Sequence, residues 1–284
     1  MSMKRMVTIM GAIYGTMAFA PLFVGDIRFI MHILIMCLIW AVVASCWDVI
    51  MGFAGIFSFG QVAFFVIGAY ASAIFAVSFG IPAVLAILLA GLFTAAMGVL
   101  VGLPCLKLAG PYVALVTFGV HMTLLPLLRG NIGKAIGSGG SVGILTIPPI
   151  TIFGYPFSSA NLVPTFYLTL LLTIICSVTI MVVIKSYWGT AFLALKDSQE
   201  FAMSLGVNAF KYKLMVFALT SFLTGIVGAA ILGALITVTA NELLAPLGAY
   251  RAVTMGALVV ILVLALPNGV MGFWTKPLTA QKQD

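Results

Sequence analysis

Long, nearly uncharged apolar runs dominate this chain and constrain its fold more than any other feature. Several exceed the ~18 residues that mark a membrane-spanning helix, and the 284-residue chain is 63% hydrophobic but only 7% charged. A soluble domain carries roughly 25% charged residues. Backbone amides in hydrocarbon need internal partners, and continuous rather than alternating apolar residues argue against a membrane barrel. The sequence therefore predicts an all-α, polytopic transmembrane bundle.

The apolar runs predict about eight spans within a single transmembrane domain that covers residues 1–284. An even number of spans places both termini on one side of the membrane. Two connections are long: residues 129–162, whose glycines and prolines predict a loop rather than a helix, and residues 185–213, the most hydrophilic part of the chain. The predicted spans cover residues 6–24, 29–47, 61–79, 82–103, 111–128, 163–184, 214–237 and 247–270.

The basic residues predict the orientation of these spans, because cytoplasmic loops are enriched in lysine and arginine. A cytoplasmic N-terminus gives nine of the thirteen basic residues to the inner side and four to the outer side. Both termini and residues 185–213 are then cytoplasmic. The same bias accounts for the net charge of +7, and we expect no nucleic-acid partner, since no basic cluster lies beside stacking aromatics. The inner set is Lys4, Arg5, Lys107, Lys185, Lys196, Lys211, Lys213, Lys276 and Lys282, and the outer set is Arg28, Arg129, Lys134 and Arg251.

The N-terminal segment is open to two interpretations. Lys4 and Arg5 precede an apolar stretch that ends in an A-x-A pattern at Ala18 to Ala20, which is typical of a cleaved signal peptide. Pro21 would directly follow the cut, which is a poor context for cleavage. This favours a retained first transmembrane helix.

Motifs for enzymatic chemistry are absent from the sequence. The four cysteines form no CxxC pair, so neither a metal site nor a disulfide framework is supported. No phosphate-binding G-x-x-x-x-G-K-[ST] loop, H-E-x-x-H pair or Ser–His–Asp grouping is present. We expect no cofactor and no enzyme activity, and any ATP hydrolysis that drives this protein must reside on separate chains.

The stretch from Asp48 to Tyr70, DVIMGFAGIFSFGQVAFFVIGAY, places four glycines and several polar residues between apolar runs. Glycines let helices approach closely, or let a helix break where it lines a cavity. Ser58 and Gln61 would then pair with the freed backbone groups. We interpret the stretch as a broken or re-entrant helix beside a translocation pathway. The alternative is ordinary helix packing through small faces.

The candidate pathway residues are Asp48, Gly55, Ser58 and Gln61, together with Thr117 and His121 on the fifth predicted span. Ionisable residues within a membrane cost free energy, and they mark functional sites by default. Two of them have a plainer interpretation. Asp48 lies near the end of its span, where an interfacial or helix-capping aspartate is ordinary, and His121 is typical of a packing histidine.

Residues 190–206, TAFLALKDSQEFAMSLG, predict a short amphipathic helix within the polar loop. Phe192, Leu195, Phe201 and Leu205 share an apolar side, and Gly206 stands where a C-capping glycine is expected. Such a helix on a cytoplasmic face would dock into a groove on a soluble partner. The alternative is an interfacial helix that anchors the loop in the lipid headgroups.

This loop resembles the coupling segment, or EAA loop, of ABC-importer permeases, and in particular the branched-chain amino-acid permease family of the LivM type. Gly189-Thr190-Ala191, Leu195-Lys196-Asp197-Ser198 and Gly206-Val207-Asn208 follow the family pattern, except that the acidic Glu200 comes one place late, after Gln199. Residues 52–70 resemble the family's G-x-x-G-x-x-S-x-G-x-A-A-F-F-x-I-G-A-Y. The stretches GPYVALVTFG, GSGGSVGI and PNGVMG are similar to later landmarks, in the family's order.

The resemblance implies the permease subunit of an ATP-driven importer in the bacterial inner membrane, for branched-chain amino acids or related small polar solutes such as amides or urea. It implies as partners two ABC ATPase subunits, a second homologous permease, a periplasmic solute-binding protein and membrane lipid. Residues 185–213 would be the cytoplasmic coupling loop. A helix pair usual in the family before the last helix has no match here. The implied ATPase-coupling residues are Lys196, Asp197, Ser198, Gln199, Glu200 and Gly206.

A rival from another class stays open at this point. A self-sufficient, ion-coupled secondary transporter or channel would use Asp48 or His121 for ion coupling. It would transport its solute with no ATPase subunit.

Overall fold

The computed structural model describes residues 3–25, 27–105, 108, 110–137, 150–152, 155–157 and 162–244. The chain forms two compact units, Met1–Thr237 and Val238–Asp284, and we consider each by itself. Of the second unit, the described residues are 238–244, which continue the helix α10. The arrangement described below is that of the first unit.

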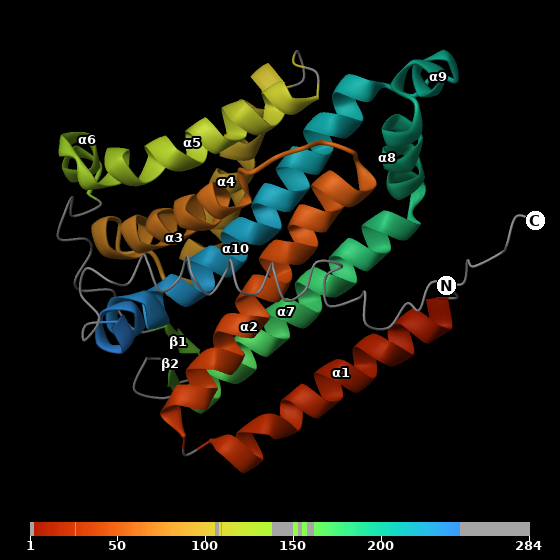
Figure 1. Ribbon diagram of the computed structural model, residues 1–284. Helices are drawn as coiled ribbons and strands as arrows, with labels where there is room; N and C mark the ends of the chain where they lie inside the picture. The colour runs from red at the N-terminus through yellow and green to blue at the C-terminus, as the bar shows by residue number, and fades with distance from the viewer. Residues whose placement is uncertain are drawn as a thin grey trace, which may run out of the picture. The chain divides into compact units, whose positions relative to one another are not determined.

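The described residues are almost entirely helical (Figure 1). The helices are α1 (Met3–Val24), α2 (Arg28–Asp48), the π-helix η1 (Val49–Phe53), α3 (Gln61–Ser78), α4 (Ala83–Cys105), α5 (Pro111–Arg129), α6 (Asn131–Ala135), α7 (Leu162–Lys185), α8 (Tyr187–Asp197), α9 (Gln199–Ser204) and α10 (Ala209–Leu244). Two three-residue strands, β1 (Ile150–Ile152) and β2 (Tyr155–Phe157), pair antiparallel with Ile150 opposite Phe157.

Six of these helical segments are long and apolar enough to cross a membrane, counted over the described residues alone. The prediction of an all-α, multi-pass membrane protein is confirmed, and the β1–β2 hairpin is its one departure within the described residues. The predicted span 247–270 lies outside them. Helix α1 runs without a break through residues 18–21, where the signal-peptide interpretation placed a cleavage site. The six segments are Phe29–Phe53, Gln61–Ser78, Ala83–Cys105, Pro111–Arg129, Leu162–Lys185 and Ala209–Ala230.

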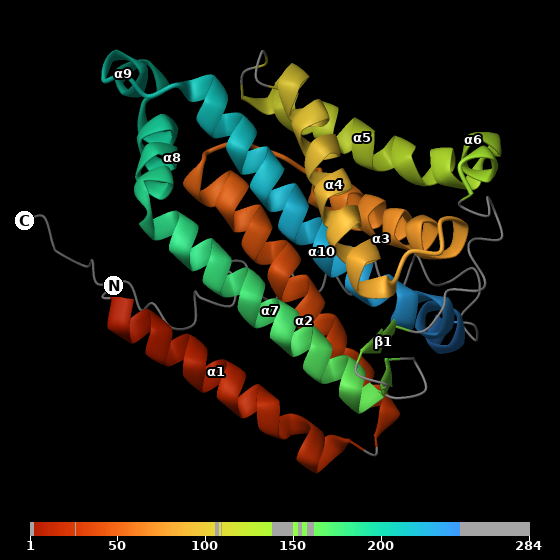
Figure 2. The same ribbon diagram turned by 180° about the vertical axis from the view of Figure 1, so that it is seen from behind.

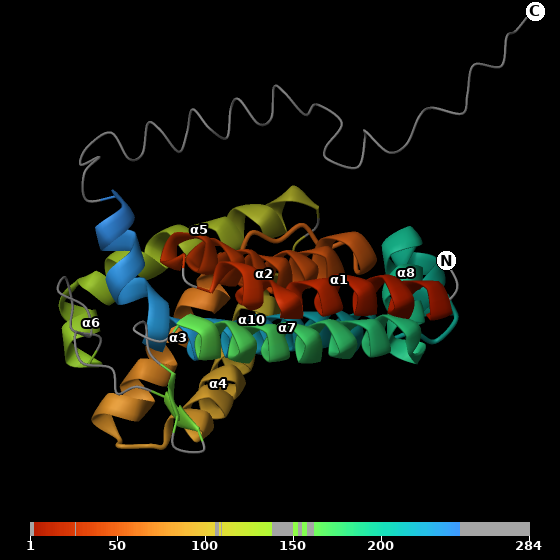
Figure 3. The ribbon, with the colours of Figure 1, turned by 90° about the horizontal axis from the view of Figure 1, so that it is seen from below.

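Helices distant in the sequence pack side by side. Helix α2 lies against α7 and α3 against α4 (Figures 1 and 2). The Thr173 hydroxyl of α7 donates to the Leu38 carbonyl of α2 at 3.4 Å. Helix α1 lies along α7, where the hydroxyls of Tyr14 and Ser177 are 2.6 Å apart. Figure 3 shows α8 at one end of the long helices and the hairpin near the other.

Small residues bring α10 into backbone contact with α3 and α4. A Cβ on Gly68 of α3 would overlap the carbonyl of Gly225, and a Cβ on Gly225 would lie 2.5 Å from Thr94 Cβ of α4. Gly228 meets the Phe65 carbonyl in the same way. Close approach through small residues is how membrane helices gain van der Waals contact, since lipid provides no hydrophobic drive between them. At Gly68 the structure therefore shows helix packing through a small residue, which was the alternative interpretation of the stretch 48–70.

Two element boundaries differ from the predicted ones for local reasons. Helix α10 begins at Ala209 instead of residue 214, because the Asn208 Oδ1 accepts from the Lys211 backbone N–H at 3.0 Å and caps the helix start. The connection 129–162, predicted to lack helix, contains the one-turn helix α6 directly after α5. Neither difference changes the order of the spans.

Candidate functional site

The chain breaks between α2 and α3 where the sequence predicted a broken helix. After Asp48 the helix widens into the π-helical η1, and the Ile56 N–H reaches back to the Ile50 carbonyl at 2.9 Å. Gly55 then takes φ +68°, a conformation that glycine adopts without the strain other residues incur. Regular helix resumes at Gln61. π-Helical turns of this kind occur frequently at functional sites.

Side chains from α5 and from the break itself pair with backbone groups that this break frees. The Thr117 hydroxyl of α5 accepts from the Phe59 N–H at 3.0 Å, and the buried Ser58 hydroxyl accepts from the Gly60 N–H at 3.3 Å. Non-helical backbone at membrane depth persists only where the protein supplies such partners or water reaches it. The prediction that the Ser58 hydroxyl pairs with a freed backbone group is confirmed, and the Thr117 hydroxyl pairs with another.

Gln61 has a different partner from the one predicted. Its side chain is buried, and its Oε1 accepts from the Thr224 hydroxyl of α10 at 3.0 Å. Its Nε2 has no hydrogen-bond partner in the described structure. Gln61 therefore ties the start of α3 to α10 and does not pair with the freed backbone, so the prediction that it would do so is wrong.

The polar loop contacts the break directly through Lys196, the penultimate residue of α8. The Lys196 ammonium donates to the Gly52 carbonyl in η1 at 2.6 Å. A Cβ on Gly55 would lie 2.9 Å from Lys196 Cγ and 3.3 Å from its Cα. The loop and the broken helix thus meet through one charged hydrogen bond and one close packing contact.

The loop itself forms two helices, so the prediction of one amphipathic helix over residues 190–206 is wrong. Ser198 adopts an extended conformation between α8 and α9, and its hydroxyl accepts from the Phe201 N–H at 3.4 Å as the N-cap of α9. Gly206, with φ +88°, ends the pair at the predicted place. The bend changes which residues are buried: Phe192 and Leu195 are buried, whereas Phe201 and Leu205 are 65% and 69% exposed.

The two ionisable residues among the predicted pathway residues are Asp48 and His121. Asp48 directly precedes η1, and a Cβ on Gly52 would meet its carboxylate. Asp48 is exposed and lines a groove of about 480 Å³ beside Tyr14, Ser45 and Ser177, between α1, α2 and α7. His121 is half-buried on α5, one turn beyond Thr117. The structure thus places Asp48 at the start of the break and brings Gly55, Ser58 and Thr117 together within it.

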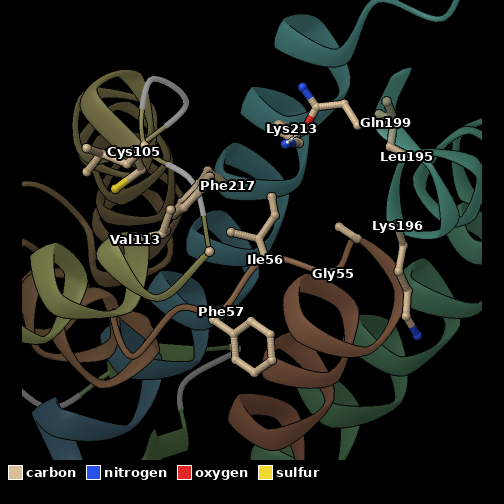
Figure 4. A pocket seen from close by; sticks show the side chains of 13 residues that line it. Gly55, Ile56, Phe57, Cys105, Val113, Leu195, Lys196, Gln199, Lys213 and Phe217 are labelled. Atoms are coloured by element: carbon tan, nitrogen blue, oxygen red, sulfur yellow. Dashed lines mark hydrogen bonds between the residues drawn. The ribbon is translucent and has the colours of Figure 1, made fainter. Parts of the chain in front are cut away.

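A cavity of about 460 Å³ opens where the break, the start of α5, the α8–α9 loop and the start of α10 converge (Figure 4). Lys213 of α10 lines it, and its ammonium donates to Gln199 Oε1 of α9 at 2.6 Å. Lys213 had no predicted site role because it was expected to lie just outside a span. The available signal was a pair of lysines, Lys211 and Lys213, immediately before a long apolar run.

Comparison with known proteins assigns the chain to a family. Residues 29–262 match the family described as "Branched-chain amino acid transport system / permease component". The chain belongs to this family. The matched range 29–262 includes all the residues that form the break, the cavity and the polar loop.

Two curated relatives of the permease are LivM proteins, each named "High-affinity branched-chain amino acid transport system permease protein LivM". That of Salmonella typhimurium strain LT2 is 26% identical over 83% of this chain and 68% of its own length. That of Escherichia coli strain K12 is 26% identical over 79% of this chain and 65% of its own length. The permease thus spans about two thirds of these relatives, and no solved structure matches it significantly.

Proposed function

We propose that this permease is the membrane-spanning subunit of an ATP-driven importer for branched-chain amino acids or related small polar solutes, such as amides or urea. It would lie in the bacterial inner membrane with a second homologous permease. Two ABC ATPase subunits would bind the α8–α9 loop, and a periplasmic binding protein would deliver the solute. Family membership and the two LivM relatives support the transport class and the solute class.

One observation carries the coupling part of this proposal: Lys196 of the loop holds the Gly52 carbonyl at the broken end of α2. A force applied to α8 would reach the break through this bond and through the Gly55 contact. The break is the part of the bundle best able to change shape, because its backbone groups rely on side-chain partners. The proposed pathway therefore lies along Gly55, Ser58 and Thr117.

The geometry of the loop divides the coupling residues into two groups. Lys196 and Gln199 face the bundle, through Gly52 and Lys213 respectively. Asp197 and Glu200 are exposed, as are Lys196 and Gln199, but no hydrogen bond links these two carboxylates to the described bundle. The apolar Phe201 of α9 and Leu205 of the turn after it are also exposed. Figure 1 shows α9 at the upper right, beyond the end of α8. We assign ATPase docking to this exposed group and transmission of the motion to Lys196.

Co-expression with the ATPase subunits tests the proposal as a whole. The tagged permease is expected to retain them on purification, and proteoliposomes holding the complex are expected to take up leucine only when ATP is supplied. Uptake by the permease alone, driven by an ion gradient, would instead establish the rival secondary transporter. Loss of ATPase retention together with ATP-independent uptake would overturn the proposal.

Truncating exposed apolar side chains of α9 and the turn after it tests the docking assignment. Phe201→Ala and Leu205→Ala are each expected to weaken ATPase binding about tenfold or more, because burying such a side chain contributes about 1.5–3 kcal/mol. Leu100→Ala is the matched control, since Leu100 is 61% exposed but lies on α4. Affinity would be measured by titrating labelled ATPase onto the purified permease. An equal loss of ATPase affinity in Leu100→Ala would contradict the docking assignment.

Single cysteines test the proposed orientation. In a background lacking the native cysteines, a cysteine at the exposed Ser204 should react with a membrane-impermeant maleimide only after the cytoplasmic side is opened. A cysteine at Ile136, 49% exposed after α6, should react in intact spheroplasts. The reverse pattern would place the α8–α9 loop outside and remove the ATPase from its reach.

A further inference from the structure

The cavity beneath the break combines an apolar wall with a cationic end. Ile56, Val113 and Phe217 contribute the apolar wall, and Lys213 stands at the end nearest α9 (Figure 4). Its volume of about 460 Å³ falls within the ~300–1,000 Å³ typical of small-molecule sites. Gly55 and Gly110, both at positive φ, leave further space because they carry no side chain.

The Lys213 ammonium lacks an anionic partner in the described part of the chain. Its acceptor there is the neutral Gln199 Oε1, and no described carboxylate lies within ion-pair distance. An ammonium has three donors, so two remain available to the cavity. Lys196 also lines the cavity, but its ammonium donates to the Gly52 carbonyl at 2.6 Å (Figure 4). Lys213 is therefore the cation that the cavity offers.

We propose that this cavity binds a small amphipathic carboxylate, with Lys213 contacting the carboxylate and the Ile56–Val113–Phe217 wall receiving a branched aliphatic group. This inference rests on the proposed function, because it gives the proposed pathway a solute-binding site at the end nearest the α8–α9 loop. A branched-chain amino acid has this combination of groups. The same cavity discriminates against amides, because a neutral amide gives Lys213 no charge to pair with.

Ligand-observed saturation-transfer NMR on the purified permease in nanodiscs tests this directly, using 4-methylpentanoate as the probe and 4-methylpentanamide as its neutral isostere. The carboxylate is expected to receive saturation and the amide to receive at least about tenfold less, since only the carboxylate carries a charge opposite to that of the Lys213 ammonium. Lys213→Met is expected to reduce carboxylate binding about tenfold or more. Lys213→Arg should retain most of it.

A matched variant separates ligand contact at Lys213 from a general effect of removing a lysine. Lys211→Met removes an exposed lysine two residues away and should retain binding. Equal binding of acid and amide, or equal loss in Lys211→Met and Lys213→Met, would overturn the inference. No ATPase enters this measurement, so its failure is distinguishable from failure of the proposed function.

Discussion

Replacing Gly68 with alanine is expected to destabilise the permease more than any other single methyl addition discussed here. The new Cβ would overlap the Gly225 carbonyl and lie 2.6 Å from its Cα, so helices α3 and α10 would have to separate. Overpacking a tight interior costs about 1–3 kcal/mol, and backbone yields less easily than a side chain. We expect a cost at or above the upper end of that range. It would appear as a lowered midpoint of thermal unfolding in detergent.

Gly119→Ala is the matched control for this prediction. Gly119 is also helical, but a Cβ there would meet nothing within 4 Å. Alanine exceeds glycine in helix propensity by up to about 1 kcal/mol, so the unfolding midpoint should stay or rise. Unfolding midpoints that fall equally in both variants would contradict the close packing of α3 against α10.

The sequence was sufficient to predict the break between α2 and α3, because local chemistry specifies it. Gly55 and the polar Ser58 depart from the pattern of a lipid-facing helix. Within a span, such residues indicate that the backbone leaves the helix inside the protein or beside a cavity. The distant side chains that bond the backbone of the break could not be predicted from the sequence. Lys196 lies 144 residues from Gly52, and no periodicity within one segment reports which distant side chain faces a free carbonyl.

The α8–α9 loop shows why periodicity alone failed. A helical pattern placed Phe192, Leu195, Phe201 and Leu205 on one side, which holds only if the helix is continuous. Ser198 is a strong N-cap residue, and it starts a new helix and rotates the last two apolar residues outward. The capping signal was present in the sequence, but choosing between one helix and two depends on burial of Phe192 and Leu195 against the bundle.

Replacing Lys196 with methionine is expected to reduce ATP-driven uptake strongly while ATP hydrolysis by the docked subunits persists. Methionine keeps much of the aliphatic stem that packs on Gly55 but loses the ammonium that holds the Gly52 carbonyl. A charged hydrogen bond of about 1.5–3 kcal/mol would be lost, so we expect uptake per ATP hydrolysed to fall more than tenfold. Gly55→Ala should act likewise, because alanine is strained at φ +68° and its Cβ would lie 2.9 Å from Lys196 Cγ.

The ratio of solute moved to ATP hydrolysed, measured in proteoliposomes, separates this role from docking. Docking variants such as Phe201→Ala should lower hydrolysis and uptake together, whereas Lys196→Met should lower uptake alone. Lys211→Met provides the control, since Lys211 is exposed and its backbone N–H, not its side chain, bonds Asn208. An unchanged ratio in Lys196→Met would show that motion of α8 reaches the bundle by another route. The π-helical turn that Lys196 holds would then serve packing only, because nothing else in the described loop bonds η1 through a charged group.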